Sequence, residues 1–177
     1  TGAVYPVTLA TPVRYAGADV PSLYVSSHGW LSAIATSSTT STNPTVPNGA
    51  APFGTMAPFW ELMSANTTLM DVGLFWQQFD PDTTPASGDE YTVVSWEHWR
   101  YSTTTTYDLN FQVKFFANGD IEYHYGTMAG ASTTIIRGSS ATSWMEAPNS
   151  LMALAINVNS TTPGIDPDTA YRFTFVP

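Results

Sequence analysis

Most of this chain alternates apolar and polar residues with a period of two, or carries short apolar runs between turn residues. Such patterns are typical of β-strands, because successive side chains of a strand point to opposite faces. We therefore predict strands at 4–9, 12–15, 22–27, 29–35, 72–79, 90–98, 107–116, 120–126, 133–137, 150–158 and 170–176. About ten short strands with Gly, Pro and Asn between them indicate an all-β fold, either a β-sandwich or a jelly roll.

The segments between these strands predict loops and at most one short helix. Residues 36–54 begin with a run of Ser and Thr and contain three prolines, and residues 80–89 form a second long loop. The stretch 57–63, which Pro58 opens, is the only helix candidate. No shift in composition marks a boundary, so we expect residues 1–177 to form a single domain.

The segment from Tyr107 to Tyr125 predicts a hairpin whose turn length follows from its side-chain register. A two-residue turn at Asn118-Gly119 would place Glu122 and His124 on the apolar face. A three-residue loop instead pairs Phe115 with Ile121, Val113 with Tyr123, Phe111 with Tyr125 and Lys114 with Glu122. We predict the three-residue loop, because a slip of one residue would turn the whole apolar set outward. Gly119 then takes the left-handed position of the turn.

Charge and composition exclude two classes of protein. The chain has a net charge of −9, with Lys114 as its single lysine beside four arginines, so we expect no nucleic-acid partner. Aromatic residues make up 14% of the chain, which argues against disorder. The 26 threonines and 17 serines supply the polar surface that charged residues provide in most domains.

The start of the chain, rather than its cysteine count, points to the cell exterior. The chain has no cysteine, so no disulfide framework is expected, and cysteine usage neither supports nor excludes secretion. No apolar run approaches the length of a membrane span. The chain begins at Thr1 rather than at Met, which is typical of a processed, secreted chain, although an engineered chain end is the alternative. Asn66 and Asn159 each open an Asn-x-Ser/Thr sequon and would accept glycans in a host that glycosylates secreted chains.

The order of several segments resembles one known family. The matching segments are Leu23-Tyr24-Val25-Ser26-Ser27-His28-Gly29-Trp30-Leu31, Ala57-Pro58-Phe59-Trp60-Glu61-Leu62, Val93-Val94-Ser95-Trp96-Glu97, Phe111-Gln112-Val113-Lys114-Phe115-Phe116 and Asn118-Gly119-Asp120-Ile121-Glu122-Tyr123-His124-Tyr125-Gly126. This order resembles the nidogen-like β-sandwich modules of secreted bacterial proteins, including extracellular proteases and adhesins. The resemblance covers roughly residues 23–126 and implies a fold rather than an activity, since such modules are appended to many proteins.

Two positions depart from the pattern of that family. His28 stands where the family usually has Asn, and Glu61-Leu62 replaces its usual acidic pair. No metal-binding role is therefore carried over from the acidic pair to this chain.

No sequence motif of an enzyme is present. His28, His98 and His124 are far apart in the sequence, and none lies in a metal-ligand spacing such as H-E-x-x-H. His28 in its turn is expected to make a structural hydrogen bond, and His124 to be solvated beside Gln112. We expect a protein that is not an enzyme, although a Ser-His-Asp site assembled in space stays open.

Calcium is the only cofactor for which the sequence offers candidate ligands. The tetrapeptide Asp-Pro-Asp-Thr occurs twice between strands and presents Asp80 and Asp82, then Asp166 and Asp168. Two aspartates one residue apart can offer oxygens to Ca²⁺, which takes 6–8 oxygen ligands. The alternative is plain turn chemistry, because Asp and Pro both favour turns.

Aromatic residues offer a candidate ligand surface. Trp76 and Trp96 follow apolar neighbours and are expected in the core, although either would also suit a sugar-stacking platform. Trp99, Arg100 and Tyr101 end a strand and lead into a polar run, so we predict an exposed patch that binds a ligand or partner.

Two functions follow from these observations. The first is a non-catalytic extracellular structural or adhesive protein, a subunit that self-assembles into a homo-oligomer or polymer such as a filament or layer. In this hypothesis residues 1–20 are a donor strand, with Val4, Tyr5, Val7 and Leu9 added to a neighbour's sheet, or else an edge strand within the chain. The alternative is an accessory module of a secreted hydrolase that binds carbohydrate or matrix.

Overall fold

The computed structural model describes residues 2–84, 87–101, 104, 106–160, 162 and 164–174, and these residues form an all-β sandwich. Among these described residues, twelve strands lie in two antiparallel sheets, with one short helix, α1, at Thr133–Ile136. The strands are β1 (Val4–Tyr15), β2 (Ala18–Ser26), β3 (Leu31–Ser32), β4 (Thr55–Trp60), β5 (Met63–Ala65), β6 (Gly73–Phe79), β7 (Tyr91–Tyr101), β8 (Asp108–Phe116), β9 (Ile121–Ala129), β10 (Thr142–Glu146), β11 (Ala153–Val158) and β12 (Thr169–Phe173). Within the described residues, no helix is long and apolar enough to span a membrane.

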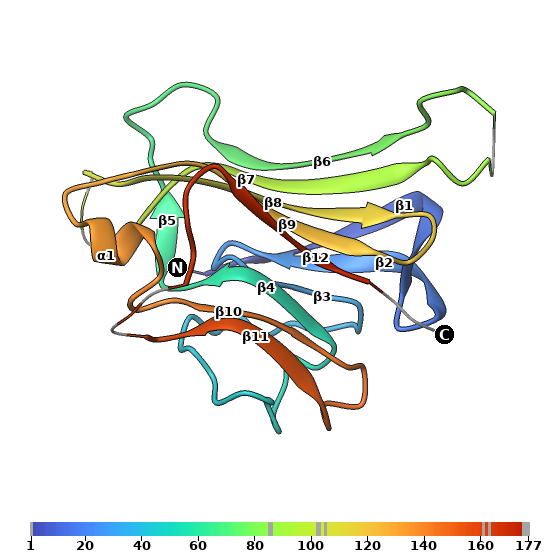
Figure 1. Cartoon of the computed structure of the whole chain (residues 1–177), viewed down its shortest axis with the longest axis horizontal. Helices are drawn as coiled ribbons and strands as arrows, with labels where there is room; N and C mark the ends of the chain where they lie inside the picture. Colours follow the sequence, from blue (N-terminus) through green and yellow to red (C-terminus); the bar gives the residue numbers. More distant parts are fainter. Residues whose placement is uncertain are drawn as a thin grey trace.

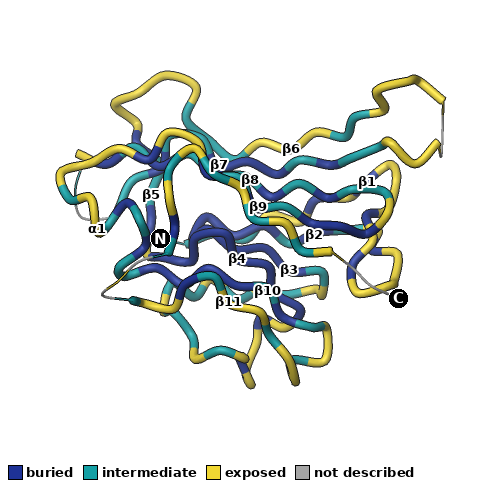
Figure 2. The backbone as a smooth tube through the Cα atoms, in the orientation of Figure 1, coloured by how far each residue is buried: buried dark blue, intermediate teal, exposed yellow. Residues whose placement is uncertain are grey.

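The two sheets stack face to face, as Figure 1 shows. Sheet A has the order β1-β2-β3-β4-β10-β11, and sheet B has the order β12-β9-β8-β7, with both β5 and β6 paired to β7. Large side chains from the inner faces fill the space between the sheets, and the dark, buried stretches in Figure 2 follow these strands. Trp96 and Phe111 stack there with ring centroids 5.1 Å apart, which confirms Trp96 as a core residue.

The predicted hairpin is confirmed. Strands β8 and β9 pair Phe115 with Ile121, Val113 with Tyr123, Phe111 with Tyr125 and Lys114 with Glu122. Gly119 has a φ of +91°, the left-handed conformation that the three-residue loop requires. One face of the hairpin is buried, and only this register places all of its apolar side chains on that face. The sequence alone could therefore predict the register.

Residues 57–63 are not a helix, and this prediction is wrong. They belong to β4 and to the turn before β5, and every residue of β4 is buried. A run that is apolar on both faces suits a central strand covered on both sides. Pro58 is tolerated because the pairing of β4 with β10 is irregular at this point, and irregular pairing accommodates a residue without an N–H.

The prediction of a strand at 133–137 is also wrong, because this segment forms α1. The Ser132 side chain caps the helix by accepting a hydrogen bond from the Ile135 N–H, and Gly138, with a φ of +90°, follows its end. Strand β10 (Thr142–Glu146) was not predicted at all, and the other differences concern boundaries. The strands predicted at 4–9 and 12–15 are the single bulged strand β1, and 29–35 contributes only the two residues of β3.

A second apolar cluster lies on the outer face of sheet A. Trp30, Trp60 and Trp144 are fully buried there, with Val46 from the long loop of residues 33–54 packed against them. The Trp30 indole N–H donates to the Thr40 carbonyl at 3.1 Å, which ties the loop to the sheet. The predicted loop therefore acts as a cover for sheet A, whereas no comparable loop among the described residues covers the outer face of sheet B (Figure 1).

Candidate functional site

Strand β1 is an edge of sheet A and is paired within its own chain. Its register with β2 runs from Val4 opposite Ser26 to Tyr15 opposite Ala18, with one bulge. Val7 and Leu9 are buried in the core, Val4 is half-buried, and Tyr5 is 52% exposed. Of the two alternatives for residues 1–20, the described residues therefore adopt the edge strand, and the donor-strand arrangement is not the one seen in this chain.

Two prolines point at the free side of β1. The Ala3 carbonyl accepts a hydrogen bond from the Ser27 N–H at 2.9 Å. Since alternate residues of an antiparallel strand bond to the same neighbour, the N–H and C=O groups of residues 3, 5 and 7 point toward β2, and the backbone of Pro6 points away from it. At the other end, Tyr15 and Ala18 flank a two-residue turn, which directs Tyr15 toward β2 and Pro12 outward. A strand that adds to this edge would meet two positions that lack an N–H donor.

The side chain of Gln78, on β6, occupies the bulge of β1. Its Oε1 accepts hydrogen bonds from the Ala10 N–H at 2.8 Å and the Thr11 N–H at 3.3 Å, and its Nε2 donates to the Thr11 carbonyl at 2.7 Å. One amide thus satisfies three backbone groups of an edge strand and links the two sheets.

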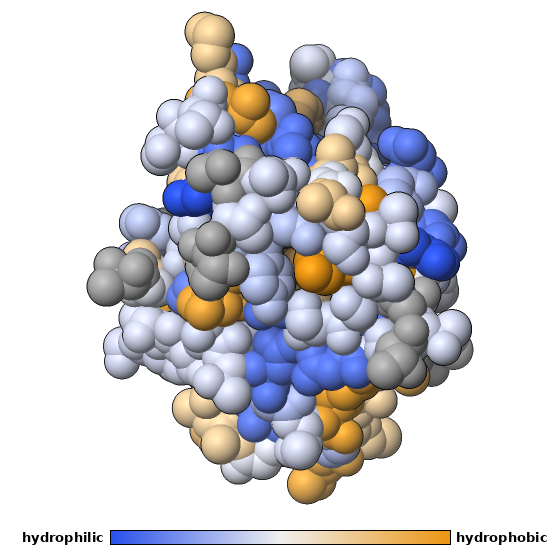
Figure 3. Space-filling view, turned by 90° about the vertical axis from the view of Figure 1, so that its left-hand side faces the viewer, coloured by the Kyte–Doolittle hydropathy of each residue, from blue (hydrophilic) through white to orange (hydrophobic). Residues whose placement is uncertain are grey.

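The opposite edge of sheet A, β11, has neither protection. Within the described residues it pairs only with β10, and no charged or proline residue occurs in it. Leu151, Met152 and Leu154 are 77%, 69% and 63% exposed. Beside them lies an apolar groove of about 660 Å³, lined also by Met145 and Phe173. Figure 3 shows apolar side chains gathered at the lower end of the molecule, where Figure 1 places β10 and β11.

Glu146 is fully buried where β10 leads toward β11. Its Oε1 accepts a hydrogen bond from the Asn48 N–H of the long loop at 2.8 Å, and no partner of normal geometry reaches Oε2. Burial raises the pKa of this carboxyl above its ordinary value, and neighbouring amides and the Ser150 hydroxyl oppose that shift only in part. The nearby Tyr15 hydroxyl is also buried and unpartnered, and burial first and the charge of Glu146 second raise its pKa.

Strand β6 is a second open edge and lies at the opposite end of the molecule from β11 (Figure 1). It also contains no charged residue and no proline. Phe75 is 48% exposed on its outer side, and Trp76 is 47% exposed above the β1 edge, where a hollow contains Tyr5 as well. Trp76, which the sequence placed in the core, is thus partly exposed, because β6 extends beyond the facing sheet.

The outer face of sheet B carries a polar groove of about 590 Å³. Across its strands, Phe75, Ser95, Gln112 and His124 are successive partners in one row. Gln112 donates to the Glu97 carboxylate at 3.3 Å, and His124 lies 2.7 Å from Glu122. The predicted position of His124 beside Gln112 is confirmed, although its imidazole is half-buried against Glu122 rather than fully solvated. The groove itself was not predicted, since it depends on neighbouring strands.

The predicted patch at Trp99, Arg100 and Tyr101 is not an exposed platform. Trp99 is 6% exposed, and its indole N–H donates to the Gly73 carbonyl at 2.9 Å. Arg100 and Tyr101 are half-buried, with Arg100 bonded to the Ala65 carbonyl and Tyr101 against the ring of Tyr107. The prediction failed because β5 and β6 pair along β7 and cover its end.

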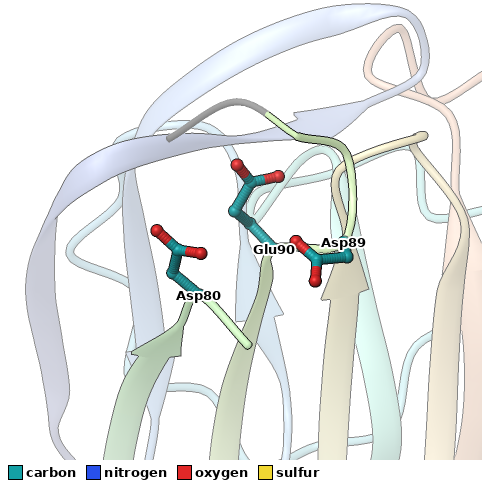
Figure 4. A group of neighbouring side chains, drawn as sticks. All are labelled: Asp80, Asp89 and Glu90. Atoms are coloured by element: carbon teal, nitrogen blue, oxygen red, sulfur yellow. The ribbon is translucent and has the colours of Figure 1, made fainter. Parts of the chain in front are cut away.

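The first Asp-Pro-Asp-Thr segment contributes to an acidic cluster between β6 and β7 (Figure 4). Carboxylate oxygens of Asp80, Asp89 and Glu90 lie within 4.8 Å of one another. Asp82, the other predicted ligand, instead accepts a hydrogen bond from the Thr84 N–H at 2.7 Å. Partial desolvation, followed by the charges of Asp82, Glu90 and Asp89, raises the pKa of Asp80. Three acids can hold a cation, so calcium stays a prediction for this loop.

The second Asp-Pro-Asp-Thr segment is a different structure at the other end of sheet B. Asp166 forms an ion pair with Arg137 at 2.6 Å, and Asp168 has a φ of +57° in the turn before β12. The two repeats therefore do not form one metal site, and the second matches the turn alternative.

His28 makes the structural contact that its turn predicted. It is buried, and its Nδ1 accepts a hydrogen bond from the Met63 N–H at 3.2 Å. Burial lowers the pKa of His28, which keeps the imidazole neutral and able to accept this bond. Gly29 beside it has a φ of +74°, and a Cβ there would lie 2.0 Å from the Phe59 carbonyl oxygen, so only glycine fits.

The two glycosylation candidates differ in accessibility. Asn66 is buried, its Nδ2 donates to the Tyr107 carbonyl, and its Oδ1 accepts from Thr68, so this packing leaves no room for a glycan. Asn159 is exposed and accepts a hydrogen bond from Asn43, while Thr161 of its sequon lies outside the described residues. Glycosylation thus stays a prediction for Asn159 alone.

Comparison with curated proteins and comparison with solved structures each gave no match. A family model described as NIDO related matches residues 2–177, which is nearly the whole chain. This match agrees with the nidogen-like segments between Leu23 and Gly126 and with the two-sheet fold that they predicted. The chain belongs to the nidogen-related family of domains.

Proposed function

We propose that this chain is a non-catalytic, extracellular structural or adhesive domain that assembles head to tail, with the β11 edge of one copy adding to the β6 edge of the next. One observation supports this proposal above the others. Two edge strands without charge or proline lie at opposite ends of the molecule, and both carry exposed apolar side chains. Strands of this kind are templates for pairing with another chain.

Electrostatics favours a second copy at these edges. The molecule has a net charge of −9, so most surfaces of two copies repel each other. No Asp, Glu, Lys or Arg occurs between Glu146 and Asp166, nor between Asp71 and Asp80. A β11–β6 contact therefore avoids charge, and Leu154 and Trp76 supply apolar area at its two sides.

The use of two different edges determines the form of the assembly. Head-to-tail contacts close into rings or continue as open filaments, whereas a twofold contact of β11 with itself stops at a dimer. The β1 edge takes no part, because Pro6 and Pro12 remove the N–H groups that an added strand needs.

Three lysine variants test the proposal by size-exclusion chromatography with light scattering. Leu154→Lys and Trp76→Lys each place a charge on one proposed edge, and both should be monomeric. Leu62→Lys is the matched control, because Leu62 is 42% exposed in the turn between β4 and β5 and lies on neither proposed edge. It should assemble like the unmodified chain. Each change makes the net charge less negative, so a loss of assembly would not result from increased repulsion.

A mixture of the two edge variants gives the sharpest result. Leu154→Lys keeps its β6 edge and Trp76→Lys keeps its β11 edge, so equal amounts should form a one-to-one dimer and nothing larger. If Trp76→Lys alone still dimerises, the contact is a twofold β11 pair and the head-to-tail arrangement is wrong. If the unmodified chain is a strict monomer at high concentration, the assembly proposal fails altogether.

A further inference from the structure

We propose that the polar groove on the outer face of sheet B binds a neutral oligosaccharide, with one sugar ring stacked on Phe75. This binding is separate from assembly, because it uses the face of sheet B rather than the strand edges. The long loop buries the outer face of sheet A, whereas the outer face of sheet B is hollowed.

Missing side chains create the hollow. Gly126 and Ala170 line the polar groove at outward-facing positions of β9 and β12, beside Asn110 and His124. A Cβ at Gly126 would lie 3.6 Å from the Asn110 carbonyl oxygen, an ordinary contact, and Gly126 has no left-handed φ. The backbone therefore does not require glycine at 126. Its effect is to keep the floor of the groove open.

Gly73 leaves room for the aromatic ring of Phe75, the proposed stacking residue. A Cβ at this position would lie 3.2 Å from the ring of Phe75, so the ring lies over the glycine on the surface of the strand. Phe75 is 48% exposed and lines a second hollow of about 490 Å³, which shares Gln112 and His124 with the polar groove. An exposed ring beside hydrogen-bonding groups can stack on an apolar face of a sugar.

The polar groups match hydroxyls rather than charged groups. Among the described residues that line the polar groove there is no lysine or arginine, which disfavours anionic sugars. The Asp108 carboxylate lies 2.9 Å from His98 Nδ1, and the Glu97 carboxylate accepts hydrogen bonds from Gln112 and Ser95. The carboxylate oxygens can accept further hydrogen bonds, and the side-chain amides can both donate and accept them. Sugar hydroxyls need partners of both kinds, because each hydroxyl is a donor and an acceptor.

Binding can be measured by isothermal titration with three neutral probes, cellohexaose, mannohexaose and chitohexaose, at up to millimolar concentration. At least one should bind the unmodified chain. Phe75→Ala should weaken that binding at least tenfold, and Phe75→Tyr should retain it. Phe53→Ala removes an exposed aromatic from the long loop that covers sheet A and should leave the affinity unchanged.

The decisive variant is Gly126→Val, because it fills the groove without disturbing the fold. Valine suits a strand better than glycine, so the melting temperature should hold or rise while the affinity falls at least tenfold. Failure of all three probes to bind, or full affinity in Gly126→Val, would overturn the proposal. Hexalysine binding in their place would assign the groove to cationic peptides instead.

The monomeric variant Leu154→Lys separates this proposal from the assembly proposal. Its affinity for the sugar should equal that of the unmodified chain, since Leu154 lies on sheet A, away from the groove. An affinity that disappears with assembly would show that the sugar site needs two copies, and the single-chain site would be wrong.

Discussion

The two edges of sheet A, β1 and β11, differ in how they meet solvent. The β1 edge carries outward-facing Pro6 and Pro12, and its bulge is filled by the Gln78 amide. The β11 edge has no proline and no charge among the described residues, and Leu154 is exposed beside it. The β1 edge is closed to an added strand because its prolines lack the N–H groups that pairing needs, whereas the β11 edge is available for pairing.

The contrast shows that β1, although its pattern suits a donor strand, is the less accessible of the two edges. β1 has the apolar alternation of a donor strand, yet Val7 and Leu9 are already buried in their own core. Its removal would therefore damage the fold as well as any contact between copies. The more exposed β11 can be changed at its surface with little effect on the monomer.

The largest expected effect comes from opening the closed edge. The double variant Pro6→Thr, Pro12→Thr restores two outward N–H groups on β1, so we expect new, larger species in light scattering. The monomer should also lose about 1 kcal/mol of stability, because proline restricts the unfolded chain. Made in the Leu154→Lys background, the double variant should regain association. Unchanged scattering would show that the prolines do not protect this edge.

A smaller effect should follow from removing the bridge to the bulge. Gln78→Ala deletes three hydrogen bonds to Ala10 and Thr11, and water replaces them in part. We expect a loss of about 1 kcal/mol in urea unfolding and faster hydrogen exchange at these two amides. Gln77→Ala, an exposed neighbour on the same strand, is the control and should change neither quantity.

Substitutions near the β11 edge and near the β1 edge of sheet A should differ in how they change the pH dependence of stability. Glu146, next to the β10–β11 turn, and buried Glu61 both have raised pKa values, so the folded chain binds protons more tightly than the unfolded chain. Their contribution to stability is full below the ordinary value of 4.5 and is lost as pH rises through the folded values.

Unfolding measured from pH 4.5 to pH 8 tests this sign. Glu146→Gln should flatten the decline in stability with rising pH, whereas exposed Asp19→Asn on the β1–β2 hairpin should leave it unchanged. A decline of equal slope in Glu146→Gln would show that this carboxyl does not contribute to it.

The smallest effect is expected at the acidic cluster that ends β6. Without metal, Asp80→Asn should raise the melting temperature slightly, because it removes a like charge beside Asp89 and Glu90. If calcium binds there, added calcium should stabilise the unmodified chain, and Asp80→Asn should abolish that gain. No shift with calcium or chelator would leave the cluster as a turn. Asp166→Asn is the control from the second repeat.

Several elements could be predicted from local pattern because burial on one face determines them. The β8–β9 register is the clearest case, since one shift would have exposed Phe111, Val113 and Phe115 together. The 57–63 segment was mispredicted for the opposite reason. Its residues are apolar on every side, and a buried strand and a buried helix then look alike.

The sequence by itself determined the all-β class, the central hairpin, the low charge and the family, because alternation, turn residues and composition are local properties. Only the tertiary structure decided which edges stay open and which aromatics reach solvent. Trp99 is buried and Phe75 exposed, although both are strand aromatics. The physical reason is that exposure depends on which strands become neighbours, and those neighbours come from distant parts of the chain.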